Sequence, residues 1–214
     1  MKIFSYKKKL IKFIQSEHSL GFVPTMGTLH PGHISLIKKS LYQCNKTIVS
    51  IFVNKPQFNN KNDYKKYPRN LKKDIKILKK LKVDYLYIPS HKEIYERKKN
   101  QGLLISAFSK KLCGKYRPGH FTAVVDVIDR FIKIINPKKI YLGKKDMQQL
   151  KILEDFLNKN YKMIKIVGCK TVREKNGIAY SSRNLSLSKN EKRIASHVYK
   201  LILKRKKSII KNKN

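Results

Sequence analysis

The chain has 214 residues, and its 51 Lys and Arg residues against 13 Asp and Glu residues give a formal net charge of +38. A chain of this length can bury roughly 70% of its unfolded surface around one main core. No apolar run is long enough to cross a bilayer, and the N-terminus lacks the apolar core of a signal peptide. The three cysteines form no Cys-x-x-Cys motif, which is typical of reduced thiols. We therefore expect a cytoplasmic protein without a membrane partner.

The positive charge does not by itself indicate a nucleic-acid-binding protein. Lysines are spread along the whole chain rather than gathered in one block, and no known nucleic-acid-binding motif is present. Clustered basic residues are the usual footprint of such a protein. We expect no specific nucleic-acid partner, although the field of the chain should attract nucleotides and small carboxylates.

Strand and helix patterns alternate along the chain. Helical spacing or apolar runs predict a helix at 5–17, a strand at 21–24, a helix starting near 31, a strand at 47–53, a helix at 71–81, a strand at 83–88, a strand at 140–143, a helix at 146–160 and a strand at 164–167. Residues 121–135 are rich in Val and Ile, so their local propensity is ambiguous, although fifteen residues is long for a strand. The alternation predicts an α/β fold, with a Rossmann-like parallel sheet and helices on both faces. Ligands of such sheets bind beyond the carboxyl ends of the strands.

A last helix is predicted after the alternation ends. Ser188 and Glu191 have the spacing of a capping box. Apolar residues then recur on one face, at Ile194, Val198, Leu201 and Ile202. From Lys204 the tail is basic with few apolar positions, and we expect it to fray.

The segment Thr25–His33, with sequence TMGTLHPGH, follows the first apolar strand and opens an amphipathic helix. Gly27 and Gly32 allow the backbone to approach a ligand closely, and Pro31 suits the turn. A new helix presents free N–H groups and its positive dipole end, where phosphate is favoured. Two histidines there can donate hydrogen bonds to phosphate oxygens. The segment indicates a nucleotide triphosphate site; a half metal site and a purely structural turn remain the alternatives.

The segment resembles the His-x-Gly-His signature of the nucleotidyltransferase superfamily, and its surroundings resemble the pantothenate synthetase (pantoate–β-alanine ligase) family. The matching segments occur in the family's order and span nearly the whole chain: Val23–His33, Val49–Phe58, Tyr67–Asp74, Gly114–Phe121, Gly143–Gln149 and Val172–Asn184. The resemblance implies ATP-dependent condensation of pantoate with β-alanine to pantothenate, through a pantoyl adenylate, with release of AMP and pyrophosphate. It also implies Mg²⁺ with the ATP, and a homodimer.

The resemblance carries roles to individual residues. It implies that His33 is catalytic and that Gln57 and Gln149 bind pantoate. The ATP-binding residues that it implies are Met26, Gly27, Thr28, Leu29, His30, Pro31, Gly32, His33, Gly143, Lys144, Lys145, Asp146, Val172, Tyr180, Ser181, Ser182 and Arg183. The metal ligands stay unknown, with Asp74 a weak candidate for placing Mg²⁺. The loop that begins at Arg117 either contributes to the site or only seats the next helix.

Three departures from the family pattern bear on these roles. Pro56 stands one place later than the family's proline, so the backbone ahead of Gln57 can differ. Lys144 stands where the family commonly has an acid. The third departure is that the small C-terminal domain of the family is present only in part. Residues 1–170 are predicted to form the nucleotide- and pantoate-binding domain, and residues 171–214 a shortened C-terminal lid. Two other functions stay open, a catalytically decayed nucleotide-binding relative and another nucleotidyltransferase.

Overall fold

The computed structural model describes residues 1–96 and 103–211. Six strands form one parallel sheet in the order β1-β4-β3-β2-β5-β6. Their bounds are β1 Lys2–Phe4, β2 Leu20–Thr25, β3 Lys46–Ile51, β4 Tyr85–Tyr87, β5 Lys139–Gly143 and β6 Lys165–Cys169. All predicted strands are confirmed, and the short edge strand β1 was not predicted. Its three residues are too few for a period to be read.

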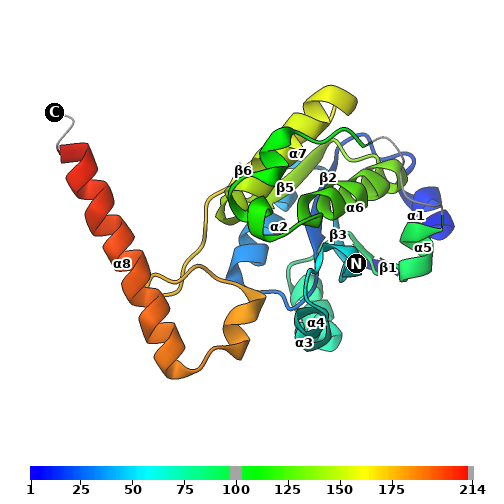
Figure 1. The fold of residues 1–214 in the computed structure, drawn as a ribbon. Coiled ribbons are helices and arrows are strands. Elements are labelled where there is room, and N and C mark those ends of the chain that lie inside the picture. The colour runs from blue at the N-terminus through cyan, green and yellow to red at the C-terminus, as the bar shows by residue number, and fades with distance from the viewer. Residues whose placement is uncertain (97–102, 212–214) are drawn as a thin grey trace.

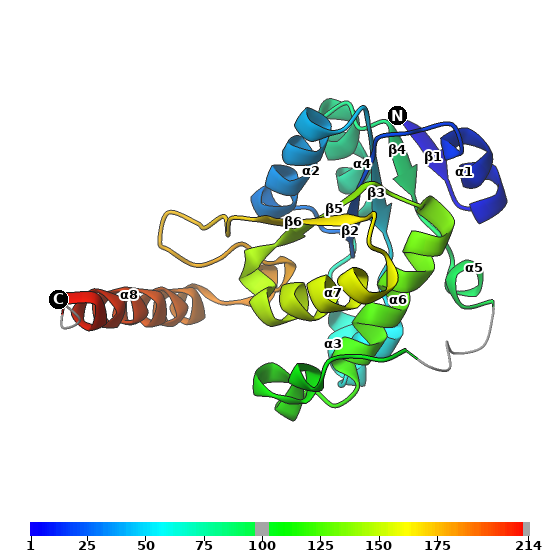
Figure 2. The same cartoon turned by 90° about the horizontal axis from the view of Figure 1, so that it is seen from above.

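Helices cover both faces of this sheet, as predicted (Figure 2). Their bounds are α1 Lys7–Ile14, α2 Pro31–Gln43, α3 Lys61–Lys66, α4 Leu71–Lys80, α5 His91–Tyr95, α6 His120–Ile135, α7 Met147–Asn160 and α8 Lys189–Lys211. Buried residues of α1, α5, α6 and α7 share one apolar cluster, and those of α2 and α4 share a second. The sheet therefore separates two cores, which is the arrangement of a Rossmann-like fold.

The ambiguous segment is a helix, α6, which buries eleven of its sixteen residues. Gly119 and Asn136 flank it in the left-handed conformation, with φ of 74° and 47°, and Pro137 follows. The buried side chains of α6 belong to the main apolar cluster. The free energy gained by this burial outweighs the slightly lower helix propensity of its Val and Ile residues. Burial decided between two local propensities that the sequence left nearly equal.

The switch point of the sheet lies between β2 and β5, which pair in parallel although they are not consecutive in sequence. From β2 the strands β3, β4 and β1 extend to one edge, whereas β5 and β6 extend to the other. Crossover helices on opposite faces leave a crevice at such a switch point, outside the carboxyl ends of the strands. The segments after β2 and after β5 therefore face each other.

Beyond β6 the chain leaves the sheet, and its described part ends in α8, which projects away from the other helices (Figure 1). The capping box is confirmed: Ser188 N donates to Glu191 Oε2 at 2.7 Å, and Glu191 N donates to Ser188 Oγ at 3.2 Å. The expectation of a frayed tail from Lys204 is wrong for the described part, because α8 continues to Lys211. Straight-chain Lys and Arg residues are good helix formers, so their charge did not end the helix.

Candidate active site

The loop after β2 is held in an uncommon backbone conformation. Gly27 and Thr28 are both left-handed, with φ of 81° and 53°. Asp74, at the start of α4, accepts hydrogen bonds from the backbone N–H groups of Thr28 and Leu29, both at 2.7 Å. Thr28 Oγ1 donates to the carbonyl oxygen of Pro68 at 2.6 Å. The turn that leads into α2 is thus fixed from outside, by the segment that precedes and opens α4.

The two histidines of the loop stack on each other at the N-terminus of α2. Their ring centroids lie 3.9 Å apart, and His30 Nδ1 accepts from the backbone N–H of His33 at 3.4 Å. Pro31 occupies the first turn of the helix, where its missing N–H costs nothing. A Cβ on Gly32 would lie 2.9 Å from His30 Cε1, so only glycine leaves room for this ring.

Both histidines are neutral at pH 7. Burial, together with the nearby charges of His30 and Lys145, lowers the pKa of His33 to about 3. Burial and Lys145 also lower the pKa of His30. Nδ1 of His33 is buried and has no hydrogen-bond partner among the described residues. A buried polar atom without a partner is costly, so it is a natural contact for a ligand or a water molecule.

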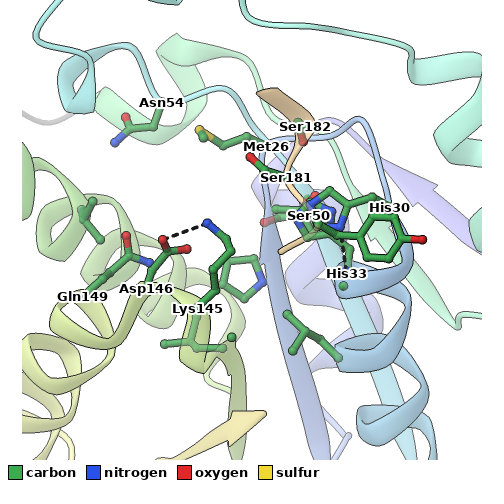
Figure 3. A pocket seen from close by; sticks show the side chains of 18 of the residues that line it. Met26, His30, His33, Ser50, Asn54, Lys145, Asp146, Gln149, Ser181 and Ser182 are labelled. Carbon is green, nitrogen blue, oxygen red and sulfur yellow. Dashed lines mark hydrogen bonds and ion pairs between the residues drawn. The ribbon is translucent and has the colours of Figure 1, made fainter. Parts of the chain in front are cut away.

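A cavity of about 230 Å³ opens at the switch point, beside these histidines. Fourteen of the predicted site residues line it: Met26, Gly32, His30, His33, Gln57, Gly143, Lys145, Asp146, Gln149, Val172, Tyr180, Ser181, Ser182 and Arg183. Figure 3 shows many of them around one space. They come from the end of β2 and the start of α2, from the segment after β3, from the end of β5 and the start of α7, and from the segment after β6.

Five predicted site residues do not line the cavity, for identifiable reasons. Gly27 and Thr28 shape the turn. Leu29 is buried in the core beside α2. Pro31 is exposed at the start of the helix. Lys144 packs along β6, where a Cβ on Gly168 would lie 3.2 Å from its Cε atom. These residues therefore support the cavity wall from behind or shape the turn next to it, and they do not contact the cavity.

The end of β5 contributes a charged pair. Lys145 Nζ lies 2.9 Å from Asp146 Oδ1, and Gln149 lies one turn further along, at the start of α7 (Figure 3). Lys145 is close enough to the histidines to lower the pKa values of both. An ammonium group and two neutral imidazoles therefore line one cavity, which suits a polyanion.

Gln57 is held from three sides although Pro56 has moved one place. Asn54 Nδ2 donates to Gln57 Oε1 at 3.1 Å, and Gln57 Nε2 contacts Met26 Sδ at 3.2 Å. His120 Nδ1 donates to the carbonyl oxygen of Gln57 at 2.8 Å. The short 3₁₀ helix Lys55–Gln57 accommodates the proline in its first turn. The loop 117–121 thus does two things: it starts α6 and it holds Gln57.

The segment after β6 forms the remaining wall. Ser182 Oγ donates to the carbonyl oxygen of Thr28 at 3.3 Å, which joins this segment to the loop after β2. Arg183 forms two hydrogen bonds with Asp63 of α3, from Nε at 3.1 Å and from Nη2 at 2.8 Å. Its guanidinium also lies 5.2 Å from the ring centroid of Tyr67. The side chains of Ser182 and Arg183 therefore attach this second predicted ATP segment to the loop after β2 and to α3.

Sequence reasoning missed several residues that line the cavity: Ser50, Asn54, Tyr67, Lys170 and Thr171. Asn54 is the most informative, because it is 1% exposed and also bonds Tyr95 Oη and Ala123 O. It lies within a segment that carried the family resemblance, at the end of a strand. A polar side chain directly after a buried strand was the available signal.

The described residues contain no group of three or more His, Cys, Asp or Glu side chains placed to hold a metal ion. Asp74, the weak candidate, does not line the cavity. It is 1% exposed, and its two oxygens accept the backbone bonds of the loop. Asp146 is the one carboxylate among the cavity-lining residues of the described chain.

No helix of the described part is both long and apolar enough to cross a membrane.

A six-stranded parallel sheet with a phosphate-suited cavity at its switch point defines a Rossmann-like nucleotide-binding fold. The pantothenate synthetase of Thermus thermophilus superposes with a TM-score of 0.88 at 34% identity, covering 95% of this chain and 74% of that chain. The chain belongs to the pantoate–β-alanine ligase family, whose model matches residues 2–214.

Two further relatives agree with this assignment. The pantothenate synthetase of Flavobacterium psychrophilum is 43% identical over 203 residues, which are 94% of this chain and 72% of that protein. A pantoate–β-alanine ligase from Francisella tularensis, in complex with β,γ-ATP and β-alanine, is 41% identical with a TM-score of 0.85. The match covers 94% of this chain and 78% of that one. The predicted family and fold class are confirmed.

Proposed function

We propose that this chain condenses pantoate with β-alanine to give pantothenate, at the expense of ATP. Family membership supports the reaction. The single structural observation that supports it is the cavity, whose lining includes two neutral histidines, Lys145, Gln57 and Gln149. One group of residues suits a triphosphate and the other suits a small hydroxy acid.

The reaction takes two steps. A carboxylate oxygen of pantoate attacks the α-phosphorus of ATP, the bond to the β-phosphate oxygen breaks, and pyrophosphate leaves. The amine of β-alanine then attacks the carbonyl carbon of the pantoyl adenylate, loses a proton, and AMP leaves. Adenylation is needed because a carboxylate has no good leaving group. Neither step needs a covalent bond to the protein, so the protein contributes orientation and charge stabilisation.

On the nucleotide side, we infer that His33 donates a hydrogen bond to the phosphate oxygens where negative charge develops. A neutral imidazole donates one N–H bond without carrying a charge that must be desolvated. His30 reaches the same phosphates, and Lys145 supplies the positive charge. Ser181, Ser182 and Arg183 receive the departing pyrophosphate, because hydroxyl and guanidinium groups are strong partners of phosphate.

On the acid side, we infer that Gln57 and Gln149 bind pantoate. A primary amide offers both a donor and an acceptor, and this matches a carboxylate that is flanked by hydroxyl groups. The amide of Gln57 already has its orientation fixed by Asn54 and Met26, and His120 holds its backbone. A fixed amide loses little side-chain entropy when the substrate binds, which favours selective recognition.

We also propose that Mg²⁺ enters with ATP. Mg²⁺ prefers oxygen ligands and usually binds through phosphates, waters and one or two carboxylates. Asp146 is the carboxylate of the described cavity wall, so it is the residue that would hold the ion next to the triphosphate. The ion would neutralise phosphate charge. A homodimer stays a prediction from the family resemblance, and a cytoplasmic location stays a prediction from the composition of the chain.

The test uses the purified chain with ATP, Mg²⁺, pantoate and β-alanine, and it quantifies pyrophosphate, AMP and pantothenate. We expect release of pyrophosphate that depends on pantoate, and pantothenate that depends on β-alanine. ATP binding without pantoate-dependent pyrophosphate would identify a decayed relative. Pyrophosphate release with other acids but not with pantoate would identify another nucleotidyltransferase.

The acid side is tested by neighbouring glutamines. Gln149→Ala should raise KM for pantoate about tenfold, the usual loss for one or two hydrogen bonds, with less effect on ATP. Gln148 is the matched control, because its amide bonds only protein groups, namely Cys113 N, Phe108 O and Lys111 O. Gln148→Ala should lower stability without a specific change in KM for pantoate. An equal loss for ATP and pantoate in Gln149→Ala would contradict this assignment.

A further inference from the structure

Asp74 stands out among the buried polar residues because it touches the catalytic loop but not the cavity. Its side chain is 1% exposed, and it does not belong to the cavity wall. Its two carboxylate oxygens accept hydrogen bonds from two consecutive backbone N–H groups, those of Thr28 and Leu29, each at 2.7 Å. These residues are 46 and 45 positions away in sequence. Leu29 directly precedes His30.

The loop needs such a support because its conformation is unfavourable by itself. Thr28 is a β-branched residue with φ of 53°, a region that costs a non-glycine residue roughly 1–2 kcal/mol. Gly27 beside it has φ of 81°, and a Cβ there would lie 3.1 Å from Asp74 Oδ2. The carboxylate thus sits inside the turn. Two charge-assisted bonds to adjacent N–H groups can offset the strain of the turn.

The position of the turn decides the position of the histidine rings. His30 follows Leu29, and its side chain accepts from the backbone of His33. The rings then stack with their centroids 3.9 Å apart. A small displacement of the turn would move both rings, and misplacing a catalytic group by about 1 Å can cost on the order of a hundredfold in rate.

We propose that Asp74 is a positioning residue for the proposed adenylation reaction, holding the left-handed turn at Gly27 and Thr28 so that His33 meets the phosphates. The inference rests on the proposed function for its kinetic consequence. Its structural content, that Asp74 sets the place of His33, stands apart from the reaction.

The first test is a double-mutant cycle on kcat for pantoate-dependent pyrophosphate release. Asp74→Asn keeps the shape of the side chain but replaces one acceptor by an N–H₂ group. We expect kcat to fall on the order of thirtyfold, with KM for pantoate changed much less. In the His33→Ala background the same substitution should cost about threefold or less, because the residue through which Asp74 acts is absent. Equal losses in both backgrounds would overturn the inference.

Asp84→Asn is the matched control. Asp84 also accepts a backbone N–H, from Thr47 at 2.9 Å, together with Lys46 Nζ at 3.0 Å. Asp84 directly precedes β4 and contacts the start of β3, at the opposite end of the sheet from the cavity. Both variants should lose stability, but Asp84→Asn should keep its kcat. A kcat loss in Asp84→Asn as large as in Asp74→Asn would mean that general destabilisation explains both.

The second test does not depend on activity. Nuclear magnetic resonance of the His33 ring should show it neutral down to pH 5 in the unsubstituted chain, because burial and the charges of His30 and Lys145 lower its pKa. A loosened turn in Asp74→Asn admits water, so the His33 pKa should rise above 5. An unchanged His33 pKa in a folded Asp74→Asn variant would refute the positioning role, even if no pantothenate were made by any variant.

The unsubstituted chain offers a third measurement should Asp74→Asn not fold. The amide protons of Thr28 and Leu29 should exchange with solvent as slowly as those of the core strands, because both bond a buried carboxylate. Fast exchange at both amides would show that Asp74 does not hold the turn.

Discussion

The sheet with helices α1 to α7 (the sheet unit, described residues 1–96 and 103–169) and the segment that ends in α8 both contain regularly spaced apolar residues, but these residues are buried to different extents. Phe22, Ile140 and Leu153 of the sheet unit are fully buried. In α8, by contrast, Val198, Leu201 and Ile202 are 52%, 65% and 59% exposed. The helix of α8 is supported mainly by local features, the capping box and a basic sequence with good helix formers. Periodicity alone therefore predicts a helix, but it does not predict what covers its apolar face.

The two regions nevertheless meet at the cavity. The sheet unit supplies His30, His33 and Lys145, whereas the segment after β6 supplies Ser181 and Arg183. The turn before α8 is braced by Ser196 Oγ, which donates to Asn176 O at 2.6 Å. One wall of the site thus belongs to the sheet unit with its two apolar clusters, and the other wall, after β6, is attached by a few polar contacts. The next four predictions separate these contributions.

The largest difference should appear in stability. Leu153→Ala removes a fully buried side chain next to the sheet, and such a change usually costs about 2–5 kcal/mol. Leu201→Ala in α8 should change the free energy of unfolding by less than about 0.5 kcal/mol, because Leu201 is exposed and alanine is a good helix former. Urea denaturation measures both. A loss above about 2 kcal/mol for Leu201→Ala would show that α8 is covered in solution.

His33→Ala tests the wall built into the sheet unit. Adenylation should slow on the order of a hundredfold, the usual loss for one preorganised donor that meets developing charge. Pantoate-dependent pyrophosphate release measures this, and circular dichroism checks the fold. His18→Ala is the control, since His18 is exposed in the loop before β2. Near-normal adenylation by folded His33→Ala would remove His33 from the mechanism.

Stability should also fall in mild acid because of the same histidine. The pKa of His33 is about 3 in the folded chain against a usual 6.5, so the unfolded chain takes up a proton first as the pH falls. The contribution is fully present above pH 6.5 and is lost as the pH falls from 6.5 towards 3. From pH 7.5 to pH 5 the loss is about 2 kcal/mol.

Denaturation of the unsubstituted chain and of His33→Gln at both pH values isolates this contribution. The difference in stability between pH 7.5 and pH 5 should be smaller in the variant. Burial also lowers the pKa values of His30 and His120, so some acid sensitivity should stay. A pH dependence identical in both proteins would mean that His33 is hydrated in solution.

The smallest effect concerns the contact between the two regions. Asp63 binds Nε and Nη2 of Arg183, which leaves Nη1 for phosphate. Asp63→Ala should weaken ATP binding about threefold and cost less than about 1 kcal/mol of stability, as is usual for exposed ion pairs. Asp155→Ala removes the same charge from an exposed position on α7. Tighter ATP binding by Asp63→Ala in calorimetry would show that Asp63 competes with phosphate instead.

The sequence by itself determined the alternation of strands and helices, the turn at Thr25–His33 and the family. These features are readable because each depends on residues a few positions apart: apolar spacing, glycine and proline at turns, and a capping box. The family resemblance selected His33, Lys145 and both glutamines, and the segments that carry them follow the carboxyl ends of strands. For a parallel sheet that placement is enough to predict that they meet.

Only the tertiary structure decided the rest. It made α6 a helix, because burial outweighs a near-balanced local propensity. It brought Asp74 into hydrogen-bonding contact with Thr28, 46 residues away, and Asp63 into contact with Arg183, 120 residues away. It also turned Lys144 away from the cavity and Lys145 towards it. Such pairings depend on how distant segments pack, and no pattern within one segment records its distant neighbours.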